Sequence, residues 1–170
     1  MGISEKQVSK WLTANPDLRL VEPSRQRENT AGPWLLNVPP MPKPRMVKSD
    51  AWKKRPAVQR YWQWKDKIRQ EAANQQLVLP PTFRATFFIA MPNSWPKRKK
   101  LEMAGKEHTQ TPDTDNLMKA LKDALCEEDS HIWHDSPIKV WSWKPAIYVE
   151  AVQPQPLLDY AALVAERYGL

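Results

Sequence analysis

The chain has 170 residues, of which 41% are hydrophobic, enough to bury one core and form one domain with extensions. Its net charge of +7 favours a polyanionic partner. A single cysteine, Cys126, excludes an intrachain disulfide and a cysteine-rich zinc site, and no apolar run is long enough to cross a membrane. The charged N-terminal residues do not form a signal peptide, so we expect a soluble, cytoplasmic protein.

The first part of the chain predicts an extension followed by the start of a core. Residues 3–14 have the apolar spacing of a short amphipathic helix. Residues 22–33 are polar and rich in turn-forming residues, which indicates a linker. A strand is expected over residues 34–38, and the proline-rich residues 39–44 that follow cannot be helical.

The middle of the chain predicts a helix, a strand and a loop. Residues 50 to about 75 are expected to be mostly helical, with the helix beginning in earnest near Pro56, because proline fits the first turn. Residues 83–91 alternate as a strand does and are apolar on both faces, which predicts a central strand. Residues 92–110 form a long basic connection, and loops of this length are usually functional. The buried side of the helix is expected to carry Val58, Tyr61, Trp62, Lys65, Ile68 and Ala72.

The last part predicts a helix over residues 115–125, strands over 138–143 and 146–152, and an apolar helix over 157–168. The two strands are expected to form a hairpin or to adjoin at an edge of the sheet. The whole order predicts a single α+β domain with a small mixed sheet of about four strands, packed by helices and flanked by N- and C-terminal helices.

Residues 111–125 carry the pattern of greatest chemical interest, two carboxylates one residue apart followed at once by a helix. Asp115 or Thr114 is expected to cap this helix. Lys119 follows Asp115 by four residues, so it reaches the same end of the helix. Two acids and a lysine suit Mg²⁺ and a phosphate. The same residues also fit an ordinary capped helix, whose dipole favours acids at its start.

A third acid, Asp135, stands just before the strand at residues 138–143. If that strand lies beside the helix, Asp113, Asp115 and Asp135 converge on one cation, which offsets their mutual repulsion. The alternative is a solvated acidic turn. His108 is either a phosphate contact or proton carrier, or a loop histidine with a local hydrogen bond.

Basic residues gather in two segments. Residues 41–70 hold ten basic residues against two acids, with aromatic residues between them, and residues 97–100 are all basic. This distribution favours contacts with DNA phosphates, although a solvated helix face explains the lysines nearly as well. The candidate DNA-binding residues are Lys43, Arg45, Lys48, Lys53, Lys54, Arg55, Lys97, Arg98, Lys99 and Lys100.

Several ordered motifs resemble the RusA-type Holliday-junction resolvases, a family of small phage and prophage endonucleases. They are residues 112–120, 123–125 and 135–138, preceded by Pro42-Lys43-Pro44-Arg45 and by a lysine-rich loop after Met91-Pro92. The resemblance covers about residues 34–152. It implies a nuclease domain over residues 31–155, after an N-terminal helical extension and linker at 1–30 and before a C-terminal helix at 156–170.

The resemblance implies a homodimeric hydrolase for DNA recombination and repair, which needs Mg²⁺, or Mn²⁺ in its place, and resolves four-way junctions by paired symmetric nicks. The family's metal-binding carboxylates match Asp113, Asp115 and Asp135, and its catalytic lysine matches Lys119. The chain departs from the pattern in having Pro112 where RusA has an arginine. It also has His134 where RusA has the first of two acids.

Other functions remain open at this point. A DNA-binding module without catalysis needs the basic segments but has no use for the three aspartates, so metal dependence separates it from a nuclease. A flap or single-strand nuclease would use the same acids. The chain could also be a scaffold acting through its terminal helices, and the N-terminal helix is a candidate for binding another protein.

Overall fold

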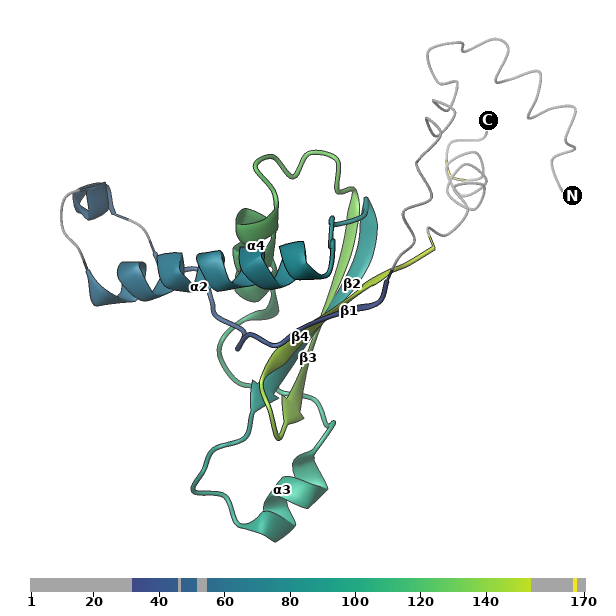
Figure 1. The fold of residues 1–170 in the computed structure, drawn as a ribbon. Coiled ribbons are helices and arrows are strands. Elements are labelled where there is room, and N and C mark those ends of the chain that lie inside the picture. Colours follow the sequence, from purple (N-terminus) through teal and green to yellow (C-terminus); the bar gives the residue numbers. More distant parts are fainter. Residues whose placement is uncertain (1–31, 46, 52–54, 154–166, 168–170) are drawn as a thin grey trace, which may run out of the picture. The chain divides into compact units, whose positions relative to one another are not determined.

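The computed structural model describes residues 32–45, 47–51, 55–153 and 167 (Figure 1). The helices expected at residues 3–14 and 157–168 lie outside this part of the chain, apart from Arg167. The strands are β1 (Trp34–Leu36), β2 (Thr82–Ala90), β3 (His134–Ser142) and β4 (Ala146–Ala151). The helices are the 3₁₀ turn η2 (Lys48–Ala51), α2 (Pro56–Asn74), α3 (Lys97–Met103) and α4 (Thr114–Leu125). The α+β fold with a small mixed sheet is confirmed.

The four strands form one sheet in the order β1-β4-β2-β3. Strand β2 pairs in parallel with β3 and antiparallel with β4, which in turn pairs antiparallel with β1. The central place expected for β2 is confirmed. The expectation that β3 and β4 form a hairpin or adjoin is wrong, because the connection at residues 143–145 carries the chain past the end of β2, which lies between them. The most apolar strand thereby gains a partner on both edges.

Helices α2 and α4 cover one face of the sheet (Figure 1). Strand alternation sends every second side chain toward them, and these side chains are the buried ones. The opposite face carries more exposed residues such as Arg84 and Ile138. The largest fully buried side chains are Tyr61, Phe83, Phe87, Leu36, Ile68, Leu117, Leu121, Ile147 and Val149.

Helix α2 differs from expectation in which tryptophan it buries. Trp64 is 4% exposed, whereas Trp62, expected in the core, is 51% exposed and lies 5.0 Å from the ammonium of Lys65. Trp64 follows Tyr61 by three residues and so shares its face of the helix, whereas Trp62 is turned away by about 100°. The Trp64 indole also donates to the carbonyl oxygen of Pro39 at 2.7 Å, which fixes the proline-rich segment against α2.

Residues 92–110 are only partly the loop that was expected, because they contain α3. Pro96 occupies the N-cap position and good helix formers follow it, which explains why a helix forms there. After α3 the chain runs antiparallel to β3 and extends the sheet locally. The amide of Gly105 donates to the carbonyl of Trp141, and the amide of Trp141 donates to Lys106, both at 2.9 Å.

Candidate functional site

Helix α4 begins one residue later than the first candidate aspartate. Asp113 occupies the N-cap position, where Asp115 or Thr114 was expected, and its carbonyl accepts the first helical hydrogen bond from Leu117 at 3.1 Å. The carboxylate of Asp113 does not cap the helix and is exposed. It is therefore available to a ligand approaching the start of α4.

Asp115 lies in the first turn of α4 and faces Lys119. The Lys119 ammonium donates to the carboxylate at 3.0 Å, and both side chains are about two-thirds exposed. The lysine holds the pKa of Asp115 below its usual range, through the hydrogen bond and its charge. Exposed pairs at this spacing add little to stability, so both side chains can exchange partners readily.

The loop before α4 is fastened to β3 by Lys139. The ammonium of Lys139 donates to the carbonyl oxygen of Pro112 at 2.6 Å and also to that of Gln110. Lys139 lies on the helix-facing side of β3, opposite Phe87 of β2. The residue next to Asp113 is thus attached to the edge strand of the sheet.

Asp135 has a different partner at the other end of α4. Its carboxylate accepts from the ammonium of Lys122 at 2.8 Å, and both side chains are only a fifth to a quarter exposed. Lys122 also lies 3.7 Å from Asp129. The hydrogen bond to Asp135 raises the pKa of Lys122 above its ordinary value.

The two ends of α4 lie beside different ends of β3. Asp135, near the start of β3, meets the last turn of the helix, whereas Lys139 meets the loop before its first turn. These two strand positions are about 13 Å apart, and Asp115 and Lys122 are about 10 Å apart along the helix. The structure therefore leaves Asp113 and Asp115 two residues apart at the start of α4, whereas Asp135 lies near the other end of the helix. No group of three or more His, Cys, Asp or Glu side chains among the described residues is placed to hold a metal ion.

His108 packs into the base of the same loop. It is 5% exposed, its ring lies 4.1 Å from that of Trp141, and its amide donates to the carbonyl of Lys139 at 2.9 Å. Its Nδ1 atom has no hydrogen-bond partner among the described residues. Burial, helped by the charge of Lys139, lowers the pKa of the imidazole. Of the two interpretations of His108, this placement favours the structural one.

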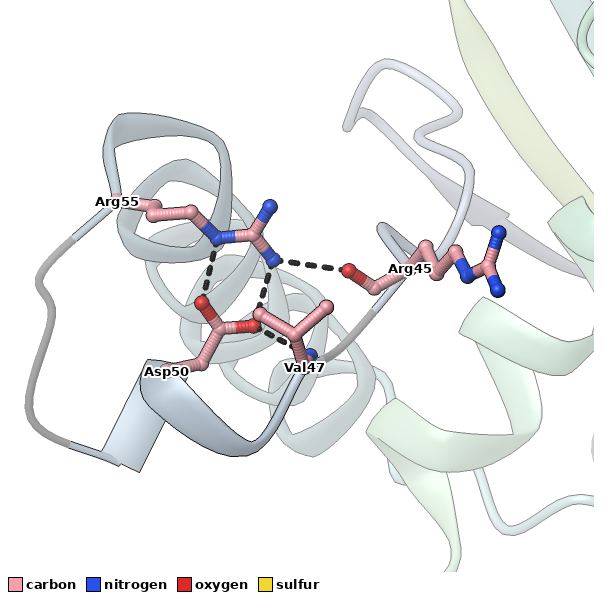
Figure 2. Close-up of polar contacts among 4 residues, drawn as sticks. All are labelled: Arg45, Val47, Asp50 and Arg55. Carbon is pink, nitrogen blue, oxygen red and sulfur yellow. Dashed lines mark hydrogen bonds and ion pairs between the residues drawn. The ribbon is translucent and has the colours of Figure 1, made fainter.

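The basic loop between β1 and α2 is held by one ion pair (Figure 2). Arg55 donates to both carboxylate oxygens of Asp50, at 2.5 and 2.6 Å, and to the carbonyl of Arg45 at 2.9 Å. Asp50 also accepts from the amide of Val47 at 2.8 Å. The hydrogen bonds from Arg55 and Val47 lower the pKa of Asp50. The guanidinium of Arg55 thus fixes the loop that displays Lys48.

Lys43 is fixed in a similar way by α4. Its ammonium forms an ion pair with Asp123, which also accepts from the hydroxyl of Tyr61 at 3.3 Å. Burial, followed by the charge of Asp123, raises the pKa of Tyr61. Asp123 therefore joins the segment that carries Lys43 to both α2 and α4.

The model of the family described as Endodeoxyribonuclease RusA matches residues 37–150 of the chain, more than half of its length. The chain belongs to this family of endodeoxyribonucleases. No curated protein and no solved structure matches it at a significant level. The match begins just after β1, contains β2, β3 and the whole of α4, and ends one residue before the end of β4. The resemblance inferred from the motifs is thereby confirmed, and the coarse activity is that of a hydrolase acting on DNA.

The donor chemistry at the start of α4 fits the metal that a RusA nuclease is expected to use. Asp113 and Asp115 offer hard, exposed oxygen atoms, and Mg²⁺ is usually bound by one or two carboxylates together with water and substrate oxygens. Asp135 fits by chemistry but lies apart in this arrangement, in the hydrogen bond from Lys122.

The candidate DNA-binding residues of this RusA-family chain fall into three groups. Lys43 and Arg55 are engaged by Asp123 and Asp50. Lys53 and Lys54 lie outside the described residues. The remaining candidates have exposed or half-exposed side chains and no ion pair within the described part of the chain: Arg45, Lys48, Lys97, Arg98, Lys99 and Lys100.

No helix in the described part of the chain is long and apolar enough to cross a bilayer.

Sequence reasoning missed three residues that shape the site, Lys122, Lys139 and Asp50. Lys139 left a signal, because it shares one face of its strand with Trp141, and a lysine among buried residues implies a specific partner. Lys122 and Asp50 gave no such signal in the sequence. The partner of Lys122 is 13 residues away and that of Asp50 is 5 residues away, and spacing alone identifies neither.

Proposed function

We propose that this RusA-family chain is a divalent-metal-dependent endodeoxyribonuclease that resolves four-way DNA junctions by paired symmetric nicks. The observation that carries the proposal is the start of α4, where Asp113 and Asp115 are both exposed and Lys119 pairs with Asp115. The loop leading into this helix is also fastened to the edge strand β3, through the hydrogen bond from Lys139 to the carbonyl of Pro112.

In this proposal Asp113 and Asp115 hold the cation, with Mg²⁺ preferred and Mn²⁺ accepted. When bound, the cation lowers the pKa of a water molecule and offsets negative charge on the phosphate. To act as a third ligand, Asp135 would have to leave Lys122 and also move toward the start of α4. Its contribution therefore needs a test separate from that of the first two aspartates.

The chain's own cations act on the phosphate. Lys119 lies about one helical turn from Asp115 and donates to its carboxylate, so its ammonium can stabilise the phosphate in the transition state or the leaving 3′ oxygen. Lys139 acts through the backbone, because its hydrogen bond to Pro112 sets where Asp113 stands. The hydrolysis adds water to phosphorus as the bond to the leaving oxygen breaks.

Junction resolution requires two cuts related by symmetry, and a homodimer with twofold symmetry supplies two such sites. The exposed cations at Arg45, Lys48 and α3 supply sequence-independent affinity for the DNA backbone. The alternatives are a flap or single-strand nuclease with the same acids, and a module that binds DNA without cutting it.

The test is incubation of the purified protein with a labelled four-way junction, a flap and a linear duplex, each with Mg²⁺ or with EDTA. We expect symmetric nicks in the junction with Mg²⁺, none with EDTA, and little cutting of the duplex. Cutting of the flap alone would replace junction resolution by flap cleavage. Binding without cutting in every metal would reject the nuclease proposal for this member of the family.

A further inference from the structure

Helix α3 is unusual among the described helices because none of its side chains is buried. It lies beyond the ends of β2 and β3, away from α2 and α4 (Figure 1). An isolated helix of seven residues is unstable in water, so α3 must be held from its base.

An aromatic cluster supplies this support. The ring of Trp95, just before α3, lies 4.8 Å from that of Trp141, which packs in turn on His108 at 4.1 Å. Trp141 is 5% exposed and is joined by backbone hydrogen bonds to Gly105 and Lys106, just after α3. Both ends of the helix are thus anchored on β3, and its outer surface is displayed in a defined position.

The displayed surface is cationic and lacks acidic partners. Lys97, Arg98, Lys99 and Lys100 form no ion pair within the described part of the chain. The only acid of α3, Glu102, lies 3.7 Å from Lys106. Such a surface is complementary to a polyanion and repels a basic protein partner.

Trp143 adds a flat apolar face to this cationic surface. Its side chain is 50% exposed just after β3, and the ammonium of Lys100 lies 6.0 Å from the ring. An exposed tryptophan among cations suits a nucleotide, whose base stacks on the ring while its phosphate meets the charge. The bases of a continuous duplex are stacked on one another and hide their faces, so this arrangement selects bases that are out of the stack.

We propose that α3 and Trp143 form a binding surface for unpaired DNA, with a base stacked on Trp143 and the flanking phosphates on the α3 cations. This rests on the proposed action on branched DNA, in which the surface would engage nucleotides opened at the branch point. It concerns DNA recognition and uses none of the aspartates.

The test measures DNA binding by the full chain in EDTA, so that no cleavage occurs. The probes are a single-stranded oligothymidine and a linear duplex of equal length, each at several salt concentrations. The variants are Trp143→Ala, Trp143→Phe and Arg98→Gln. The control is Trp133→Ala, which removes a tryptophan that is 57% exposed just before the other end of β3.

We expect Trp143→Ala to weaken binding of the oligothymidine by roughly 5- to 100-fold. Duplex binding should change much less, and Trp143→Phe should retain most of the affinity. Arg98→Gln should weaken both probes and reduce the salt dependence by about one counterion. Trp133→Ala should change neither probe.

Equal losses on both probes, or no loss with Trp143→Ala, would overturn the surface proposed here. An equal effect of Trp133→Ala would do the same. Because these outcomes are binding measurements without metal, they are separate from a failure of cleavage. Absence of all DNA binding would instead reject both this proposal and the proposed function.

Discussion

The ammonium of Lys139 and the backbone carbonyl of Pro112, 2.6 Å apart, join the edge strand of the sheet to the residue that precedes Asp113. The same ammonium also serves the carbonyl of Gln110. Lys139, which lies on the helix-facing side of β3, therefore fixes the path of the chain into the proposed metal site.

Replacing Lys139 by Met should weaken divalent-metal binding by about tenfold, as expected for loss of a group that orients ligands without touching the metal. The apparent affinity for Mn²⁺ can be measured by paramagnetic relaxation, independently of cleavage. Lys139→Arg, which keeps donors and charge, should lose less. Lys144→Met is the control, since Lys144 is exposed and its side chain forms no hydrogen bond within the described residues. Equal Mn²⁺ affinity in Lys139→Met and the wild type would show that Lys139 does not position the metal site.

Lys122 and Asp135 should prove to be coupled in stability. Their charged hydrogen bond is partly buried, so Lys122→Met should lower the free energy of unfolding by about 1–3 kcal/mol. A double-mutant cycle with Asp135→Asn, followed by urea unfolding, measures the coupling directly. The metal-free protein should show a loss in the double mutant smaller than the sum of the two single losses. Additive losses would mean that the two side chains do not interact.

His108 should make the fold sensitive to mild acid. A lowered pKa in the folded state means that the unfolded chain binds the proton more readily. The free energy of unfolding should therefore fall as the pH drops below the ordinary histidine pKa of about 6.5, and be constant above it. His108→Phe keeps an aromatic ring against Trp141 and should flatten this fall between about pH 7.5 and pH 5.5. The exposed His131→Phe is the control, and an unchanged pH profile in His108→Phe would contradict the argument.

Asp50→Ala distinguishes two effects on DNA binding, the ordering of the basic loop and the net charge of the protein. Removing this acid makes the protein more positive, so charge alone predicts tighter DNA binding. Because Asp50 fixes Arg55 and the basic loop, we expect weaker binding, by roughly three- to tenfold, as preorganisation is lost. Asp66→Ala changes the net charge equally at a side chain that is 77% exposed on α2, and it should not weaken binding. Fluorescence anisotropy with a labelled junction in EDTA compares the two. Tighter binding by Asp50→Ala would show that charge alone matters there.

Much of the fold could be predicted from local patterns of apolar and polar residues in the sequence. Alternation located β2, and its two apolar faces indicated its central place, while the apolar stripe of α4 fixed that helix to within a residue. The pairing of β3 and β4 was misread because a short connection usually implies neighbouring strands. Here the central position of β2 decides the order, and no feature local to residues 138–152 reports it.

The candidate site could be predicted only in part, because some of its contacts join residues that are far apart in the sequence. Asp115 and Lys119 are four residues apart, so helix geometry alone brings them together, and Asp113 precedes the same helix directly. The place of Asp135 depends on which way α4 runs along β3, a long-range relationship that motif order does not contain. The hydrogen bond from Lys122 is the visible result of that direction.

The central claim is that the exposed carboxylates at the start of α4 serve metal-dependent cleavage and not DNA binding. The most direct measurement compares Asp113→Asn with the wild type in junction cleavage with Mg²⁺ and in junction binding with EDTA. The account predicts a loss of cleavage of about a hundredfold or more, with binding unchanged within about twofold. Full cleavage by Asp113→Asn, or an equal loss of binding and cleavage, would contradict it.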